Sequence, residues 1–327
     1  MKLFHRFAAL VAALAMLVGF AGTAMANDTG PQCVRLKIAY SGLMLLAEKQ
    51  NLSPVVCVSV PAGPQVVDAL RNLSGVTFGG IASVPVIKMA SNGDDPLIVA
   101  TMFTNPEAVG LVTLDDSPAF RDPCALKGAR IGYTAETNGH IYLTNLLAAC
   151  KLTMSDVIPV EGKPAALVSA LVTGNVSTAL LWDPYIQQAE RLARANGRVV
   201  ETHYRRDLHL LAFHIVTTRT KLVGNEEAIK DYLRALIKIE EQVNGEKRAE
   251  AQATLENMLG LEPGDLKHFM DNTTFRVELN VPMLTNALAA EQKWYGTVRP
   301  ITTPRTDMTQ FIYPSILEAI DASRVKR

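Results

Sequence analysis

Polar and aromatic side chains recur in this sequence directly after short apolar runs, at positions where a buried strand would end. The clearest case is Trp182-Asp183-Pro184-Tyr185, which follows the apolar run 176–181. An indole ring can stack on a flat ligand or face a cation, and a carboxylate accepts hydrogen bonds from donor groups. Other apolar runs are followed by Tyr40, Ser41, Gly42, Ser83, Thr137, Asn138, Gly139 and His140. Together with Trp182 and Asp183, these residues are the candidate ligand-binding residues.

The sequence carries none of the common catalytic or metal-binding signatures. It has no Gly-x-Ser-x-Gly elbow, no phosphate loop ending in Gly-Lys-Ser/Thr, no His-Glu-x-x-His and no Cys-x-x-Cys pair. His203, His209 and His214 are close in sequence, but on a strand the last two would face opposite sides. We therefore expect no enzyme, no metal site and no cofactor.

The elements that position the candidate residues form a faint internal repeat. Residues 36–85 and 130–184 both show the order strand, helix, strand, helix, strand, helix, and Ile38-Ala-Tyr-Ser matches Ile131-Gly-Tyr-Thr. The expected elements include strands at 55–60 and 130–134, a helix at 164–172 and a last helix that starts at 182–184. Strands that alternate with helices predict parallel sheets joined by right-handed crossovers. A chance similarity between two generic α/β patterns is the alternative, and it would still leave two α/β units.

In open α/β sheets, ligands bind beyond the carboxyl ends of the strands, which is where the candidate residues are expected. The helices that follow begin with N–H groups that lack internal partners and can hold an anion. Ser83 and Asp183 could instead simply cap these helices, as serine and aspartate often do. The convergence of several such ends on one cleft favours a binding site.

The N-terminus predicts export. Residues 1–26 combine a basic start, the apolar run Phe7–Phe20 and the small residues Ala24-Met25-Ala26, which is typical of a secretory signal cleaved after Ala26. A membrane anchor is the alternative, but the apolar run is shorter than the roughly 20 residues that a spanning helix needs. Lys and Arg number 32, as do Asp and Glu, and this balance does not indicate a nucleic-acid partner.

Exported proteins meet an oxidising compartment, so an even number of cysteines suggests disulfides. Cys33 precedes the first expected strand and Cys57 lies in the second, so adjacent parallel strands would bring them together. Cys124 precedes the strand near residue 130, and Cys150 ends the helix that returns to the start of that strand. We expect the pairs Cys33–Cys57 and Cys124–Cys150; four buried free thiols are the alternative.

Four segments of the chain resemble the solute-binding proteins of ABC importers for nitrate, sulfonates and taurine, a family that includes binders of pyrimidine precursors. The most specific segment is 170–185, which is close to the family pattern AL-x-x-G-x-VDA-x-x-x-W-[DE]-PY; segments 69–80, 107–113 and 122–133 match more weakly. Thr77 and Ser177 stand where the family usually has an aspartate. These departures concern strand starts and leave the expected fold unchanged.

The resemblance implies an α/β fold of the two-lobed periplasmic type II class, in which two crossing strands join the lobes. Lobe one would comprise 27–106 plus 215–327, and lobe two 107–214. The expected protein is periplasmic and monomeric, holds a small-molecule solute between its lobes, and meets an ABC permease transiently. A ligand-sensing adaptor and an enzyme on the same fold are the alternative classes, although the cysteine run of the pyrimidine-synthesising enzymes is absent here.

The ligand class follows from the charges at the expected cleft. The candidate segments contain no Arg or Lys, while Glu136 and Asp183 bring negative charge, whether they contact the ligand or only cap helices. A bare mineral anion such as nitrate would be repelled by them, and a zwitterion would not. We therefore expect taurine or a related sulfonate, with a pyrimidine or thiamine precursor or a nitrate-like anion as the alternative.

Overall fold

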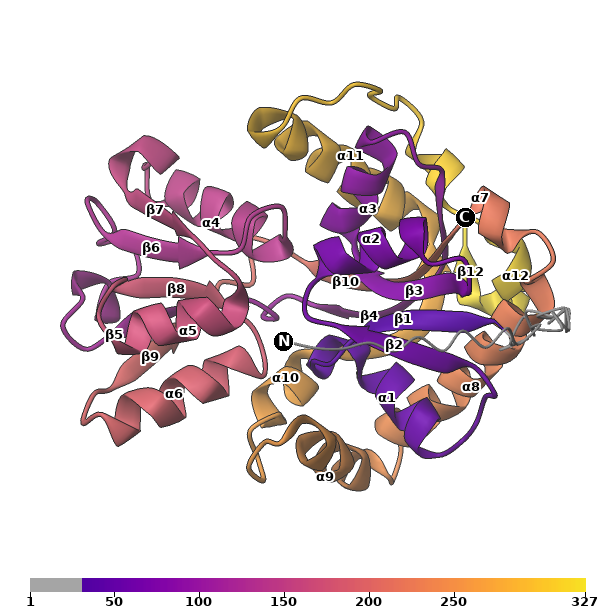
Figure 1. Ribbon diagram of the computed structural model, residues 1–327, viewed down its shortest axis with the longest axis horizontal. Coiled ribbons are helices and arrows are strands. Elements are labelled where there is room, and N and C mark those ends of the chain that lie inside the picture. Colours follow the sequence, from indigo (N-terminus) through magenta and orange to yellow (C-terminus); the bar gives the residue numbers. More distant parts are fainter. Residues whose placement is uncertain (1–30) are drawn as a thin grey trace, which may run out of the picture.

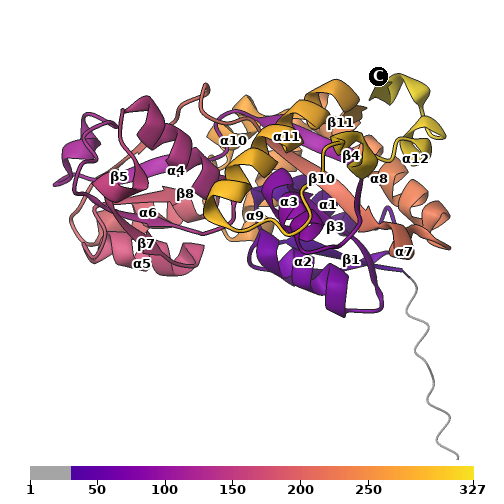
Figure 2. The ribbon, with the colours of Figure 1, turned by 90° about the horizontal axis from the view of Figure 1, so that it is seen from above.

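The computed structural model describes residues 31–327, so the predicted signal segment and its cleavage site lie outside the described residues. Figure 1 shows two lobes side by side, each built on one sheet, and the view from above in Figure 2 shows the same separation. Both sheets are mixed and flanked by helices, which confirms the predicted α/β class. We call the part around the seven-stranded sheet the large lobe and the part around the five-stranded sheet the small lobe. Among residues 31–327, no helix combines the length and apolar character needed to cross a bilayer.

The elements alternate along the chain much as the repeat predicts. The strands are β1 (Gln32–Leu36), β2 (Val56–Val60), β3 (Val76–Ala82), β4 (Pro96–Asn105), β5 (Gly110–Leu114), β6 (Arg130–Tyr133), β7 (Ile158–Glu161), β8 (Thr178–Leu181), β9 (Val200–His203), β10 (Leu211–Thr218), β11 (Thr274–Asn280) and β12 (Val325–Lys326). The α-helices are α1 (Gly42–Lys49), α2 (Gly63–Asn72), α3 (Ser83–Ser91), α4 (Asn138–Ala149), α5 (Pro164–Val172), α6 (Tyr185–Ala195), α7 (Arg219–Leu222), α8 (Glu226–Asn244), α9 (Arg248–Leu259), α10 (Lys267–Asn272), α11 (Val281–Val298) and α12 (Ser315–Glu318). Short 3-10 helices occur at Ala39–Ser41, Pro118–Phe120, Met154–Asp156, Met308–Phe311 and Ala322–Arg324.

The large lobe is a sheet in the order β12-β11-β4-β10-β3-β1-β2. β1 pairs in parallel with β2 and β3, whereas β10 runs antiparallel to both β3 and β4. All residues of β3 are buried, as expected for a central strand that has helices on both faces. The carboxyl ends of β1 and β3 therefore meet at one edge of this sheet.

The small lobe is a sheet in the order β7-β6-β8-β5-β9. β6 pairs in parallel with β7 and β8, and β5 runs antiparallel to β8 and β9. One core cluster packs α4 on one face of this sheet, and a second cluster packs α5 and α6 on the other. The lobe thus has its own core on each face of the sheet.

The chain passes between the sheets twice, after β4 and before β10. β10 lies in the large sheet from Leu211 onward, where it pairs with Asn105 at the end of β4. The lobe boundaries expected from the sequence, 107–214 for the second lobe, stay a prediction. The two passages lie side by side, so they form a paired connection of the kind about which two lobes can rotate.

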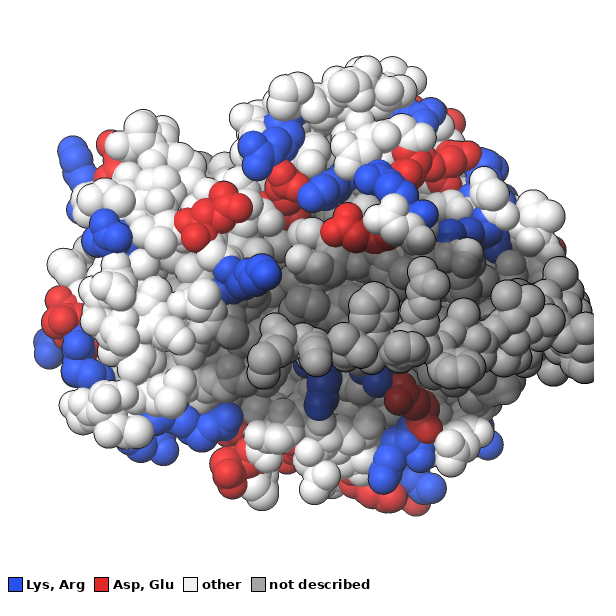
Figure 3. Space-filling model, viewed as in Figure 1, with Lys and Arg blue, Asp and Glu red and all other residues white. Residues whose placement is uncertain are grey.

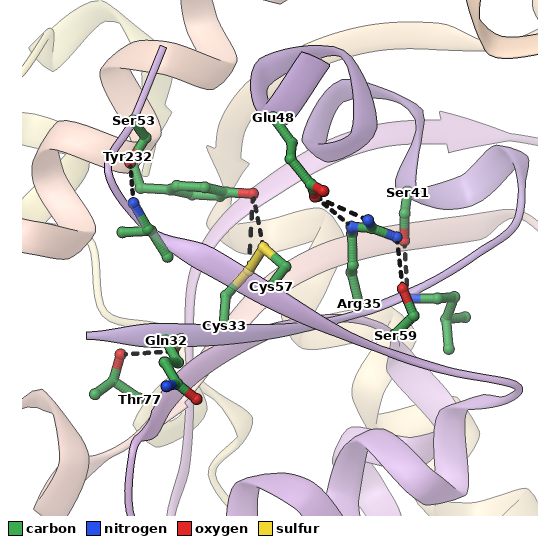
Figure 4. The surroundings of a disulfide bond; sticks show 12 residues. Gln32, Cys33, Arg35, Ser41, Glu48, Ser53, Cys57, Ser59, Thr77 and Tyr232 are labelled. Atoms are coloured by element: carbon green, nitrogen blue, oxygen red, sulfur yellow. Dashed lines mark hydrogen bonds and ion pairs between the residues drawn. A yellow bond between two sulfur atoms is a disulfide. The ribbon is translucent and has the colours of Figure 1, made fainter. Parts of the chain in front are cut away.

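A disulfide joins Cys33 in β1 to Cys57 in β2, with 4.3 Å between the two Cα atoms. These residues are direct partners in the parallel register of the two strands, as the sequence argument required. Figure 4 shows the Tyr232 hydroxyl directed at this bridge, 3.6 Å from Cys57 Sγ. The same view shows Arg35 between Glu48 and Ser59, which ties β1 to α1 and β2.

The second disulfide joins Cys124 to Cys150, with a Cα separation of 5.2 Å. Cys150 is the C-cap of α4 and Cys124 lies in the loop before β6. Both disulfides lie within one lobe each, and no cysteine of the described residues is free. Neither bridge ties one lobe to the other, so movement between the lobes remains open.

Candidate functional site

A small apolar cavity lies between the lobes, at the carboxyl ends of strands from both sheets. It encloses only about 30 Å³, whereas sites for organic ligands usually hold roughly 300–1,000 Å³. Its walls are formed by Leu36, Ile38, Tyr40, Ala62, Gly63, Ala82, Pro85, Val109, Thr137, Asn138, Trp182 and Phe213. A solute could enter this space only if the lobes moved apart, which the paired connection allows.

Three helices begin at this cavity without a capping side chain. Ala62 and Ala82 are the N-caps of α2 and α3, and alanine has no side-chain acceptor for the first N–H groups. Thr137, the N-cap of α4, makes no capping bond because its hydroxyl donates to the carbonyl of Thr134 at 2.8 Å. Backbone donors and three helix dipoles from the two lobes therefore converge on one apolar space, an arrangement that suits an anionic group.

Four of the predicted residues line the cavity: Tyr40, Thr137, Asn138 and Trp182. The Tyr40 hydroxyl donates to the carbonyl of Ala108 at 2.6 Å. This hydrogen bond joins the large lobe to the segment between β4 and β5, where the chain first passes to the small lobe. Asn138 shares a 2.6 Å hydrogen bond with His209. The site predictions for these residues remain proposals, and their placement is what supports them.

The other predicted residues are not walls of the cavity. Ser41 Oγ accepts a hydrogen bond from the backbone N–H of Leu36 at 3.2 Å. Ser83 Oγ lies 3.1 Å from His214 Nε2, and this ring is bonded to Thr101 through its other nitrogen at 3.0 Å. Both hydroxyls therefore have protein partners already.

The predicted glycines and His140 take part in packing. A Cβ at Gly139 would lie 3.4 Å from the Trp182 ring, and one at Gly42 would lie 3.2 Å from Leu255. The His140 ring stands edge-on to Trp294, with 5.1 Å between ring centroids. Burial lowers the pKa of His140 to about 4, so this ring is neutral at physiological pH.

Trp182 and Asp183 are almost fully buried at the end of β8. Asp183 is not a helix cap, since α6 begins after Pro184, and Ser83 is the first residue of α3 rather than its cap. Asp183 Oδ1 and Trp182 Nε1 have no hydrogen-bond partner among the described residues. Burial raises the pKa of Asp183 to about 7, and the negative charges of Glu190 and Asp265 act in the same direction.

Glu136 belongs to the small lobe and is held by two cations of the large lobe. Its carboxylate lies 2.7 Å from Lys88 and 2.6 Å from Arg299. In Figure 3, acidic and basic side chains gather together where the two lobes meet. Glu136 therefore presents no uncompensated negative charge, and the sequence argument that it repels a mineral anion does not hold in this conformation.

We expect Glu136→Gln to favour the open arrangement of the lobes, because it removes both ion pairs across the cleft. Partly exposed ion pairs are each worth about 0–1 kcal/mol, so the shift is modest and should shrink in 0.5 M salt. Solution X-ray scattering at low salt should show a larger radius of gyration for this variant. Glu161→Gln, in the same groove but without an ion pair to the large lobe, is the control; equal radii for the two variants would remove this role from Glu136.

The sequence reasoning missed Ala62, Gly63 and Ala82. Their signal was the absence of a cap: both Ala62-Gly63-Pro64 and Ala82-Ser83-Val84-Pro85 start helices where Ser, Thr, Asp or Asn would be expected. The same pattern occurs at Lys163-Pro164, where α5 starts uncapped away from the cavity, so this signal alone would not have identified the site.

The three histidines considered as metal ligands lie apart. His214 is bonded to Ser83 and Thr101, His209 to Asn138, and His203 to the carbonyl of Phe120 at 3.1 Å. Within residues 31–327, no cluster of three or more His, Cys, Asp or Glu side chains is arranged to hold a metal ion.

The chain belongs to the NMT1/THI5-like family, whose model matches residues 55–239. This match confirms the resemblance drawn from the sequence segments. No curated protein sequence shows a significant match to the chain.

The fold is shared with solved periplasmic binding proteins. The aliphatic sulphonate binding protein SsuA from Escherichia coli is 22% identical, with 86% of this chain and 91% of that chain covered and a TM-score of 0.72. The alkanesulfonate-binding protein SsuA from Xanthomonas axonopodis pv. citri, bound to MOPS, is 21% identical over 87% and 98% of the chains, also at 0.72. The nitrate-binding protein NrtA from Synechocystis PCC 6803 is 11% identical over 90% and 89%, with a TM-score of 0.70. All three names describe binding proteins, and none names an enzyme.

Proposed function

We propose that this protein is a periplasmic solute-binding protein that captures a small organic anion between its lobes and delivers it to an ABC-type permease. The observation that carries the proposal is the convergence of three uncapped helix N-termini from both lobes on one apolar cavity. An anion held by donors of both lobes would stabilise the closed arrangement, because neither lobe alone offers all of the donors. The family and the shared fold support the same function.

A sulfonate such as taurine is the favoured ligand. The cavity has no charged side chain in its wall, so backbone N–H groups would meet the oxyanion, as helix N-termini do elsewhere. The apolar walls around Trp182 and Phe213 suit an organic portion better than a bare mineral anion. The names of two structural neighbours mention sulfonates, which agrees with this choice.

The residues that we assign to the ligand are Tyr40, Thr137, Asn138 and Trp182, with backbone N–H groups at the starts of α2, α3 and α4. Ser41, Gly42, Ser83, Gly139 and His140 are not walls of the cavity and pack against or bond to other residues of the protein. We assign residues 107–214 to the moving small lobe and residues 1–26 to the export signal. The protein would act as a monomer that meets its permease transiently.

A ligand panel tests this function. Purified protein would be titrated with taurine, ethanesulfonate, nitrate and a hydroxymethylpyrimidine, each followed by thermal unfolding and by calorimetry. We expect the sulfonates to raise the melting temperature, because a ligand at 100 times its Kd stabilises the folded state by about 2.7 kcal/mol. Sodium chloride at matched ionic strength is the control. A panel in which no anion binds at millimolar concentration would overturn the proposal, and binding of the pyrimidine alone would replace the ligand class.

A further inference from the structure

A second, polar cavity lies between the lobes and shares no wall residue with the apolar cavity. It has a volume of about 320 Å³ and is formed by α6 and β9 of the small lobe and by the loop and helix α10 of the large lobe. Figure 1 shows α6 and α10 on facing sides of the lobe boundary. We call it the acidic chamber; its walls are Ile186, Gln187, Glu190, Thr202, Tyr204, Gly264, Asp265 and His268.

Several buried acceptor atoms at this chamber have no partner. Gln187 is 7% exposed and lines the chamber, yet its Oε1 makes no hydrogen bond in the described part of the chain. Thr202 Oγ1 is likewise buried and unpartnered, and so is Oδ1 of Asp183, whose pKa the side chain of Gln187 lowers. Leaving a buried polar atom unpaired costs about 1–3 kcal/mol, so three such atoms together indicate a missing donor.

The charge of the chamber is negative. Asp265 is paired with Arg191 at 2.6 Å and Glu107 with Arg206 at 3.0 Å. His268 Nε2 also lies 3.2 Å from Glu107, but burial lowers the pKa of this ring, so it adds no full positive charge. Glu190 forms no ion pair or side-chain hydrogen bond with any residue from 31 to 327, and the nearby positive charges of Arg191 and Arg194 lower its pKa less than burial raises it. Of the two carboxyl groups in the chamber wall, Glu190 is therefore the one without a salt bridge.

An aromatic surface completes the wall. The rings of Tyr204 and His268 are stacked, with 4.0 Å between centroids and 21° between planes. The stack crosses the boundary between the lobes, because Tyr204 follows β9 and His268 lies in α10. A tyrosine face attracts cations through the charge distribution of its π-system.

We propose that the acidic chamber binds a primary ammonium group. An ammonium group has three donors and no acceptor, which fits three unpartnered acceptors near the carboxylate of Glu190, which has no salt bridge. A metal ion is disfavoured, since no group of three metal-binding side chains in the described residues is suitably arranged. The ammonium group belongs either to the solute held in the apolar cavity or to a separate amine.

Asp183 lies between wall residues of the two cavities along the chain. It follows Trp182, which lines the apolar cavity, and precedes Gln187, which lines the acidic chamber and lowers the pKa of Asp183. Whether one solute with an anionic end and an amine occupies both cavities is therefore tested with taurine below. The chamber itself does not depend on the anion site, because none of its walls is a wall of the apolar cavity.

The experiment uses ethylammonium chloride as the probe and calorimetry as the readout. We expect the native protein to bind ethylammonium and to bind tetramethylammonium, which lacks N–H donors, at least tenfold more weakly. Glu190→Gln should weaken ethylammonium binding by at least tenfold, and Thr202→Val should weaken it as well. Glu241→Gln, on the exposed face of α8, is the charge-matched control and should bind as the native protein does.

The outcomes separate the alternatives. Equal binding of ethylammonium by Glu190→Gln and the native protein, or no binding by a native protein with a normal melting curve, would overturn the proposal. Ethanesulfonate binding that survives in Glu190→Gln shows that the variant is folded and tests the anion site separately. If taurine affinity falls in Glu190→Gln while ethanesulfonate affinity does not, the ammonium group belongs to the solute; if taurine is unaffected, a separate amine occupies the chamber.

Discussion

Ala82→Asp should strongly weaken the binding of a sulfonate while leaving the protein folded. Ala82 is the N-cap of α3, with an extended backbone (φ −82°, ψ 167°) that aspartate adopts readily, and it lines the apolar cavity. The new carboxylate would accept from the free N–H groups of α3 and place a negative charge where the anion binds. Capping stabilises a helix by roughly 1 kcal/mol, whereas losing charge-assisted hydrogen bonds costs about 1.5–3 kcal/mol each. We expect a loss of affinity of about a hundredfold.

Ala82→Asn is the matched control, because it caps α3 with similar volume but without charge. Calorimetry would measure the ethanesulfonate affinity of both variants. The difference between the two affinities isolates the effect of the negative charge from the effect of the cap. Melting curves should place both variants at or above the native melting temperature. If Ala82→Asp binds a sulfonate as tightly as the native protein does, the anion is not held at the start of α3 and the site assignment is wrong.

Most of the fold could be predicted from local patterns. The helix expected at 164–172 is α5, and the strands expected at 55–60 and 130–134 are β2 and β6 within one residue at each end. These elements are short and bounded by glycine, proline or polar residues, so local signals define them. The start of α6 was placed too early, because Trp182-Asp183-Pro184 forms a buried turn before the helix begins at Tyr185.

The site could be predicted only in outline. A strand end followed by an aromatic or polar residue indicates the edge where a ligand binds, and Tyr40, Thr137, Asn138 and Trp182 lie there. Whether a hydroxyl faces the cavity depends on distant partners: His214, which bonds Ser83, is 131 residues away in the chain. The ion pairs that neutralise Glu136 come from Lys88 in α3 and from Arg299, which follows α11 and is 163 residues away in the chain. Such pairings follow from tertiary packing, which no local pattern encodes.

Asp183→Asn should remove a pH dependence of stability that the native protein shows above pH 5. Burial raises the pKa of Asp183 from 3.8 to about 7 in the folded state. Between these values the folded protein holds a proton that the unfolded chain has released, so the free energy of unfolding falls as pH rises, and it stays low above pH 7. The slope is about 1.4 kcal/mol per pH unit, or ~3 kcal/mol between pH 5 and pH 8.

Urea unfolding of both proteins at pH 5 and pH 8 measures this effect as a difference between native and variant. Subtracting the variant from the native protein removes the pH-dependent contributions of the other buried groups, which both proteins share. Glu291, whose pKa burial raises to about 8, also lowers the free energy of unfolding as pH rises. His140 and His209, whose pKa values burial lowers to about 4, raise the free energy of unfolding as pH rises toward 6.5. Asp156→Asn is the control, because the pKa of this exposed aspartate is lowered by its bonds to Thr153 and it stays ionised over the whole range. A native-minus-variant difference that is constant between pH 5 and pH 8 would mean that Asp183 ionises normally. In that case a partner absent from the described contacts would have to hold its carboxylate.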